Sequence, residues 1–278
     1  MKISFAILRK KLYFRIPVAL CIGILLSYTA GVLAMDKILF PGAAEPTSRP
    51  PKSGNITLNS GEAKLDAFFS RGETDKPVIL YSHGNGETLS GIMPLLKSFI
   101  ARGYTVMAYD YAGYGNSTGY PSEKQAYMDI EAAYSYLIGV PGINPHNIVV
   151  MGFSVGSGPS CYIAEKYPVK ALVIISGFAS AAQVLLPFAV PFDKFPNAER
   201  LKNCKVPLMI IHGRHDKIVP VRNAGKLFDS TVAPLRRIHF EEAGHNDIFY
   251  RTINFFGKLN NFLDDVDKLR QEFQEYQR

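Results

Sequence analysis

The chain has 278 residues and a formal net charge of +7, enough length for one large domain with a short appendage. Residues 1–40 hold six Lys and Arg residues against one Asp, a net charge of +5, which leaves +2 for residues 41–278. Because the basic charge gathers at one end and not over a broad face, the composition argues against nucleic-acid binding.

The N-terminus combines a basic flank, residues 1–15, with an uncharged apolar segment, residues 16–35. Twenty such residues are long enough to cross a bilayer as a helix. The basic flank predicts a cytoplasmic N-terminus, with the rest of the chain across the membrane. Cleavage as a signal peptide is the alternative, with Val32-Leu33-Ala34 as an acceptable small-residue site. If the chain is bacterial, its domain is therefore predicted to be anchored on the non-cytoplasmic side of the membrane. The alternative prediction is a secreted or periplasmic domain.

Residues 36–54 are predicted to be a lead-in, because the stretch 41–54 is rich in Pro, Gly, Ser and Thr. Eight strand-like segments follow. The first two alternate apolar and polar residues, as half-exposed antiparallel strands do, whereas the third to seventh are continuous apolar runs typical of buried parallel strands. The eight segments are residues 56–58, 65–69, 78–81, 105–109, 148–151, 171–175, 208–211 and 237–240.

Helical patterns lie between these strands. The clearest follows Pro121 and begins with a capping box, Ser122 and Gln125, before apolar residues at helical spacing. Strands that alternate with helices predict an α/β fold with a mostly parallel sheet covered on both faces. The predicted helices are residues 88–101, 122–138, 155–166, 221–229 and 248–275.

Residues 176–206 depart from this alternation between the sixth and seventh strands. One interpretation is a short lid over the carboxyl edge of the sheet, where α/β proteins bind ligands. The other is an ordinary helix that faces the core. Leu185 and Leu186 lie in this segment and are predicted to line a substrate pocket.

Residues 152–156, Gly-Phe-Ser-Val-Gly, stand between the fifth strand and the helix that follows it. At such a junction G-x-S-x-G forms a strained turn that raises the serine hydroxyl above the sheet edge. The bare pattern is a weak signal, because Gly and Ser are common. Its position directly after an apolar strand favours Ser154 as a nucleophile.

A nucleophilic serine needs a base, and the base needs a carboxylate to orient it, in the chain order Ser, Asp or Glu, His. Asp216 stands in a turn after the seventh strand, whereas Asp193 and Asp229 are predicted to be solvent-exposed. His245 lies in the loop after the last strand, from which a base can reach Ser154, and the other five histidines are predicted to be structural or surface residues. A catalytic triad of Ser154, Asp216 and His245 needs no metal or cofactor.

The segment after the third strand, residues 83–86, has the sequence His-Gly-Asn-Gly. Its backbone N–H groups face the same sheet edge as the serine. The N–H of Gly84 or Asn85, together with that of Val155, is expected to form an oxyanion hole. The alternative is a glycine turn that only ends the strand.

The fourth strand is followed by residues 110–117, Asp-Tyr-Ala-Gly-Tyr-Gly-Asn-Ser. This segment is interpreted as structural support for the loops at the sheet edge. Tyr111 and Tyr114 are in addition predicted to be walls of the substrate pocket.

These motifs together resemble the α/β-hydrolase superfamily, over about residues 37–260. They are most similar to its branch of membrane-associated single-domain hydrolases, which includes the palmitoyl-protein thioesterases. The resemblance implies an α/β-hydrolase fold: an eight-stranded, mostly parallel sheet with helices on both faces and a short lid, preceded here by an N-terminal apolar helix. Depalmitoylases of this branch often reach membranes through a cysteine-rich N-terminus, whereas this chain has an apolar segment with the single Cys21.

The leading functional prediction is a serine hydrolase, with residues 55–278 as its catalytic domain and a lid at about 176–206. Its expected substrates are carboxylic esters or acyl thioesters of lipid-like groups, because a short apolar lid and a membrane segment suit acyl chains. A serine peptidase of the prolyl-aminopeptidase type is the alternative, although residues 176–206 contain no Glu pair to hold a peptide amine. A non-catalytic binding module is the third, although a competent residue fills every catalytic position.

Overall fold

The computed structural model describes Val18, residues 21–31, 35–41 and 55–185, Val190, and residues 193–276. Its single sheet has eight strands in the order β1-β2-β4-β3-β5-β6-β7-β8. β2 pairs antiparallel with β1 and β4, and all other pairs are parallel. The eight predicted strands are confirmed, with ends that differ by at most two residues: β1 (Asn55–Ser60), β2 (Ala63–Ser70), β3 (Val78–Ser82), β4 (Thr105–Tyr109), β5 (Ile148–Phe153), β6 (Ala171–Ile175), β7 (Leu208–Gly213) and β8 (Arg236–Glu241).

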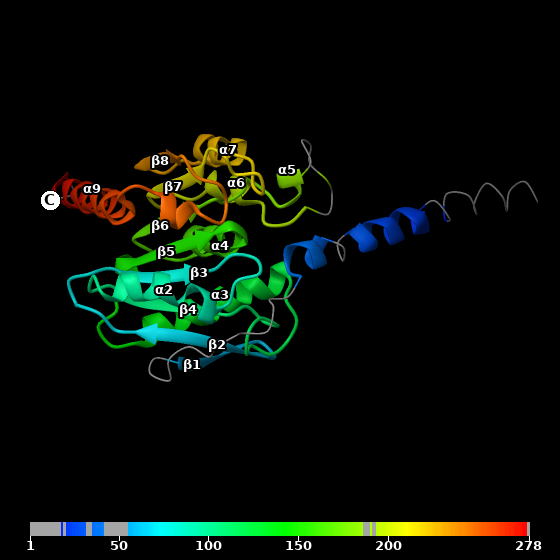
Figure 1. Ribbon diagram of the computed structural model, residues 1–278, viewed down its shortest axis with the longest axis horizontal. Coiled ribbons are helices and arrows are strands. Elements are labelled where there is room, and N and C mark those ends of the chain that lie inside the picture. Colours follow the sequence, from blue (N-terminus) through cyan, green and yellow to red (C-terminus); the bar gives the residue numbers. More distant parts are fainter. Residues whose placement is uncertain are drawn as a thin grey trace, which may run out of the picture.

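Helices cover both faces of the sheet (Figure 1). Successive strand residues point to opposite faces, so that Leu80 and Val150 belong to one buried cluster and Ile79 and Val149 to the other. The first cluster is covered by α3 (Glu123–Gly139), α4 (Ser157–Lys166), α6 (Asn197–Leu201) and α7 (Arg222–Ser230). The second is covered by α2 (Leu89–Ile100), α8 (Ile248–Arg251) and α9 (Phe255–Tyr276).

Two predicted helices differ from the structure, one by a break within it and one in its N-terminal cap. The helix predicted over residues 248–275 is divided into α8 and α9, and Asn254 between them has a φ of 52°. Asn tolerates this left-handed conformation, which a continuous helix cannot contain. At the start of α3 only half of the predicted capping box forms, because Ser122 Oγ accepts the Gln125 N–H while the Gln125 side chain donates to Ser60 and Asp129.

The segment predicted as a lid combines both of its interpretations. It contains α5 (Ala182–Leu185) at the carboxyl edge of the sheet and α6 further along the chain. Phe195 and Asn197, at the start of α6, are fully buried, and α6 packs against α4. The second half therefore faces the core, and only the first half borders the sheet edge. Leu186 and the side chain of Leu185 lie outside the described residues.

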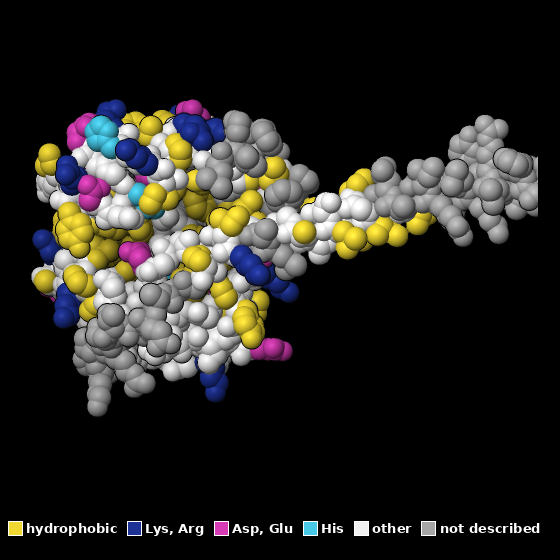
Figure 2. Space-filling model, turned by 45° about the vertical axis from the view of Figure 1, so that its right-hand side comes forward, with side chains coloured by type: hydrophobic (Ala, Val, Ile, Leu, Met, Phe, Trp, Pro, Cys, Tyr) yellow, Lys and Arg dark blue, Asp and Glu magenta, His cyan; other side chains and the backbone are white. Residues whose placement is uncertain are grey.

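Ahead of the domain, the helix Cys21–Leu39 has 19 residues and is long and apolar enough, by length and composition, to cross a membrane. A signal sequence near the N-terminus meets the same criteria. The helix projects from the side of the domain opposite to the end of α9 (Figure 1), and apolar side chains lie along its surface (Figure 2). Ile24, Leu25 and Leu26 are between 63% and 65% exposed.

We expect Leu259→Ala to lower the free energy of unfolding by about 2–5 kcal/mol, the usual cost of a buried Leu-to-Ala cavity. Leu259 is fully buried where α9 meets the sheet. Chemical denaturation of the purified chain measures the change. Gln271→Ala, at an exposed position of the same helix, is the control and should change stability by less than about 0.5 kcal/mol. Equal effects of the two substitutions would contradict the packing described for α9.

Candidate active site

Ser154 occupies a strained turn between β5 and α4. Its φ of 53° lies in the left-handed region, which costs a residue with a side chain about 1–3 kcal/mol and is found mostly at functional sites. The turn is close to its neighbours, because a Cβ on Gly152 would collide with the Gly156 carbonyl, and one on Gly156 with the Ser82 carbonyl. Only glycine fits both positions, as the G-x-S-x-G pattern predicts.

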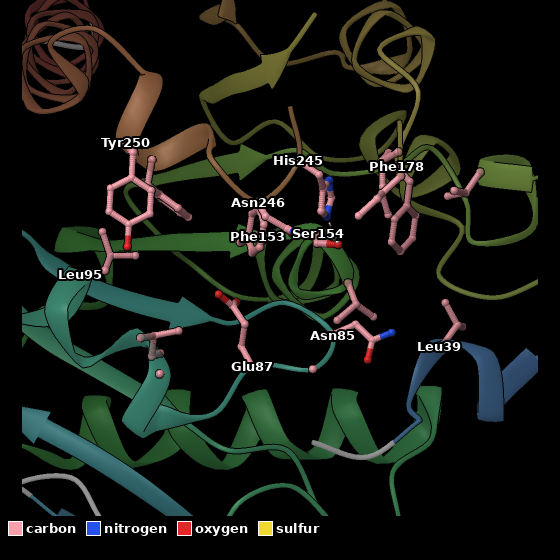
Figure 3. A pocket seen from close by; sticks show the side chains of 18 of the residues that line it. Leu39, Asn85, Glu87, Leu95, Phe153, Ser154, Phe178, His245, Asn246 and Tyr250 are labelled. Carbon is pink, nitrogen blue, oxygen red and sulfur yellow. Dashed lines mark hydrogen bonds between the residues drawn. The ribbon is translucent and has the colours of Figure 1, made fainter. Parts of the chain in front are cut away.

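The side chains of Ser154, His245 and Asp216 form one hydrogen-bonded chain (Figure 3). Ser154 Oγ lies 2.9 Å from His245 Nε2, and His245 Nδ1 lies 2.7 Å from Asp216 Oδ2. They come from the end of β5 and from the loops after β7 and β8, so the parallel sheet brings them to one edge. Each residue is less than 9% exposed. In this arrangement an imidazole can accept the serine proton while a carboxylate orients the ring.

The turn that carries Asp216 is itself held by hydrogen bonds. The N–H groups of Ile218 and Val219 donate to Asp216 Oδ1 over 2.9 and 2.7 Å. Burial alone would raise the pKa of Asp216, but the hydrogen bond and the charge of His245, with the Val219 N–H, outweigh it and the pKa is lowered. Burial lowers the pKa of His212, whose Nε2 lies 2.8 Å from the Val219 carbonyl. His212 is therefore a neutral structural residue.

The loop after β3 offers fewer anion donors than its sequence suggests. The Gly84 N–H donates to Glu87 Oε2 over 2.6 Å, so the prediction that Gly84 serves as an oxyanion donor is wrong. Among the described residues the Asn85 N–H has no hydrogen-bond partner. Val155 lies in the short 3₁₀ turn η2 (Ser154–Gly156), at a helix start, where N–H groups lack partners inside the helix. Asn85 and Val155 remain as candidate donors.

Glu87 was not predicted as a functional residue. Its carboxylate accepts a hydrogen bond from the N–H group three residues earlier, the same spacing as the Glu-to-backbone contact of a capping box. The Glu three residues after Gly84 was a sequence signal for this contact. Polar side chains three residues after a glycine more often face solvent, however, so the signal is weak. Figure 3 shows Glu87 on the wall of the pocket below Phe153.

Tyr111 and Tyr114 are not pocket walls, contrary to the prediction, because they are 1% and 0% exposed and lie beneath the loop after β3. The Tyr111 hydroxyl donates to the His83 carbonyl over 2.8 Å, and the Tyr114 hydroxyl lies 3.2 Å from Asn85 Oδ1. Their rings meet edge to face at 5.7 Å, a favoured aromatic geometry. Both tyrosines therefore support the loop from below, the role predicted for their segment as a whole.

Ser154 and His245 open onto a cavity of about 840 Å³, a size that suits a small-molecule ligand. Leu39 and Phe178 lie on one side of Ser154, and Leu95 and Tyr250 on the other (Figure 3). The lining is mostly apolar, and its one carboxylate among the described residues is that of Glu87. From the segment predicted as a lid, Ala181 and Val184 line the cavity, next to the position of the predicted Leu185.

We expect the stability difference between the wild-type chain and Asp216→Asn to shrink in acid. The pKa of Asp216 in the folded chain lies below the ordinary value of 3.8, so the ionised carboxylate stabilises the fold above about pH 4, and this contribution is lost as the pH falls through the lowered pKa. Chemical denaturation of both chains from pH 7 to about pH 3 measures it. A difference that stays constant over this range would contradict the lowered pKa.

Comparisons with known proteins agree with this fold. The family model described as "Serine aminopeptidase, S33" matches residues 73–198. Over 198 residues the chain is 35% identical to human α/β hydrolase domain-containing protein 17B, covering 69% of each chain. It is 31% identical to the mouse 17C protein over 190 residues, covering 66% of this chain and 59% of that one.

Among solved structures, an esterase of Pyrococcus furiosus superimposes with a TM-score of 0.66 at 18% identity, over 80% of this chain and 98% of the esterase. At that identity the match concerns the fold. The two relatives, by contrast, are similar in sequence over 69% and 66% of this chain. The chain is a hydrolase of the α/β-hydrolase superfamily and belongs to the family of α/β hydrolase domain-containing protein 17.

Proposed function

We propose that the chain is a serine hydrolase that cleaves carboxylic ester or acyl thioester bonds of lipid-like acyl groups, with Ser154, His245 and Asp216 as its catalytic triad. The proposal rests on one observation above all. The strained Ser154 places its hydroxyl 2.9 Å from His245 Nε2 at the edge of an apolar cavity. Residues 55–278 are the proposed catalytic domain.

In the first half of the reaction, Ser154 Oγ attacks the acyl carbonyl while His245 Nε2 accepts the hydroxyl proton. Asp216 keeps His245 in the required tautomer and stabilises the imidazolium. His245 then returns the proton to the leaving alcohol or thiol, and the acyl group stays on Ser154. Water attacks this acyl-serine with the same base, which releases a carboxylic acid and restores the serine hydroxyl.

The N–H groups of Asn85 and Val155 are the proposed donors to the oxygen anion of each tetrahedral intermediate. A donor of this kind contributes about 3–4 kcal/mol in other serine hydrolases. Asn85 lies in the loop that Tyr111 and Tyr114 support from below. Glu87 holds the same loop from the side of the cavity, through the Gly84 N–H.

Acyl groups are the proposed substrates because the cavity offers them apolar surface on both sides of Ser154. Leu95 and Tyr250 lie on one side and Leu39 and Phe178 on the other (Figure 3), and Phe249 and Phe256 also line the cavity. Burial of a methylene group contributes about 0.8 kcal/mol, so this lining favours long chains over short ones. The basic flank at residues 1–15 supports a domain on the non-cytoplasmic side, anchored by the N-terminal helix or released by cleavage.

The peptidase alternative takes support from the description of the matching family model. An aminopeptidase must bind a free amine, for which a carboxylate in the cavity is the natural partner. Among the described residues Glu87 is the carboxylate that lines the cavity, and the Gly84 N–H already occupies its Oε2. The apolar lining therefore favours esters. Turnover of peptide anilides without turnover of p-nitrophenyl acyl esters would reverse this preference.

Ser154→Ala is expected to abolish labelling by a fluorophosphonate probe and to reduce ester turnover by more than about 10³-fold, because the nucleophile is lost. In-gel fluorescence and a p-nitrophenyl ester assay measure the two effects. Ser180→Ala is the matched control, since Ser180 is buried and its hydroxyl has no hydrogen-bond partner among the described residues. Labelling that survives in Ser154→Ala would remove Ser154 as the nucleophile.

Glu87→Ala is expected to lower kcat about tenfold with little change in KM, because the loop that presents the Asn85 N–H loses its hydrogen bond to Glu87. Glu87→Gln keeps an acceptor at this position and should restore most of the activity. Steady-state kinetics with a soluble ester measure both variants. Equal losses in the two would indicate that the charge of Glu87 matters and not the acceptor.

A further inference from the structure

The end of the N-terminal helix is fixed to the domain by buried side chains. Met35 and Phe40 are only 8% and 5% exposed. The Phe40 ring packs edge to face against Tyr111 at 5.9 Å and against Phe195 at 6.0 Å. A linker that only tethered a domain to a membrane would not bury aromatic side chains in this way.

Polar contacts hold the same segment in one position. Asp36 Oδ2 lies 3.3 Å from Lys194 Nζ, and both side chains are largely buried. The Asn85 side-chain amide lies 3.5 Å from the Ile38 carbonyl. The helix end is thus in contact with the loop that carries a candidate oxyanion donor.

The segment also forms part of the cavity that holds Ser154. Met35, Ile38 and Leu39 line it, and Figure 3 shows Leu39 on the helix, facing the cavity from the side of Phe178. Ile38 is 57% exposed and Ile218, another lining residue, is 53% exposed. These two apolar side chains therefore lie at the mouth of the cavity and form part of its rim.

The earlier part of the same helix, away from the domain, has exposed apolar side chains. Ile22, Ile24 and Leu25 are each more than half exposed, and the helix is long and apolar enough to cross a membrane. Exposed apolar surface of this extent marks contact with a membrane or with another protein. The same helix thus presents apolar side chains to its surroundings at one end and to the cavity of Ser154 at the other.

We propose that Met35, Ile38 and Leu39 form a substrate-binding wall, along which an acyl ester or thioester passes from the bilayer to Ser154 without crossing water. The N-terminal helix is then a part of the binding site as well as an anchor. The proposal rests on the hydrolase function proposed above, and it names the source of the substrate as a membrane lipid surface.

The test uses the full chain in phosphatidylcholine nanodiscs, with a fluorogenic palmitoyl ester in the bilayer and a water-soluble butyryl ester of the same fluorophore. Leu39→Trp should lower the palmitoyl-to-butyryl ratio of kcat/KM at least tenfold, because the indole fills the cavity beside the wall. Lys37→Trp places the same side chain at an exposed position of the same helical turn that does not line the cavity, and it should leave the ratio unchanged. A ratio unchanged in Leu39→Trp overturns the proposal.

A second measurement separates the wall from the proposed function. Ser154→Ala in nanodiscs with a palmitoyl ester that carries a photoreactive diazirine should be crosslinked within residues 35–40, detected by peptide mass spectrometry. Crosslinks confined to other segments overturn the proposed wall, whatever the activity. Failure of the fluorophosphonate probe to label the folded wild-type chain overturns the proposed serine-hydrolase function instead, and the crosslinks still decide where the acyl chain lies.

Discussion

The contact between the turn at Ser154 and the end of β3 is the constraint on which the site depends. Gly156 approaches the Ser82 carbonyl so closely that any side chain would collide with it, and Ser82 is paired with Gly152 in the sheet. The loop with Asn85 and Glu87 leaves β3 directly after Ser82. One backbone contact therefore fixes the serine hydroxyl relative to the candidate anion donors. Because this contact lies between a strand and a helix start, it holds these groups more precisely than flexible loops would. The strain at Ser154 persists because both strands and α4 would have to move to relieve it.

Aromatic packing and hydrogen bonds stabilise the loops next to this contact. Tyr111 and Tyr114 hold the loop after β3 from below, and backbone N–H groups hold the carboxylate of Asp216. The hydroxyls of Tyr111 and Tyr114 and the carboxylate of Asp216 are buried, and each has a hydrogen-bond partner, as most buried polar groups do. Phe40 packs on the same tyrosine rings. The aromatic cluster thus connects the N-terminal helix to the candidate oxyanion loop through direct contacts, which is the physical basis for treating the helix end as part of the site.

The proposed chemistry and the proposed substrate depend on different parts of the molecule. Acyl transfer requires Ser154, His245 and Asp216 at one edge of the sheet, an arrangement that many α/β-hydrolases with different substrates share. Preference for lipid-like groups depends on the cavity, whose walls come from α2, from α8 and α9, and from the segment with Met35, Ile38 and Leu39. Because these walls are separate from the reacting groups, substrate choice can differ between hydrolases that share the same triad.

The eight strands, the turn at Ser154 and the chain order of Ser154, Asp216 and His245 could be predicted from the sequence, because each depends on local spacing and on hydrophobic patterns a few residues long. The directions of the Tyr111 and Tyr114 rings could not, since a residue at the end of a strand can turn toward the cavity or beneath the loop, and neighbours distant in the chain decide which. The hydrogen bond from the Gly84 N–H to Glu87 could not be predicted either, because it depends on the conformation of the loop. Sequence alone determined which groups meet at the sheet edge. The tertiary structure decided which of these groups face the cavity, and that the end of the N-terminal helix lines it. Both depend on packing between segments that are distant in the chain.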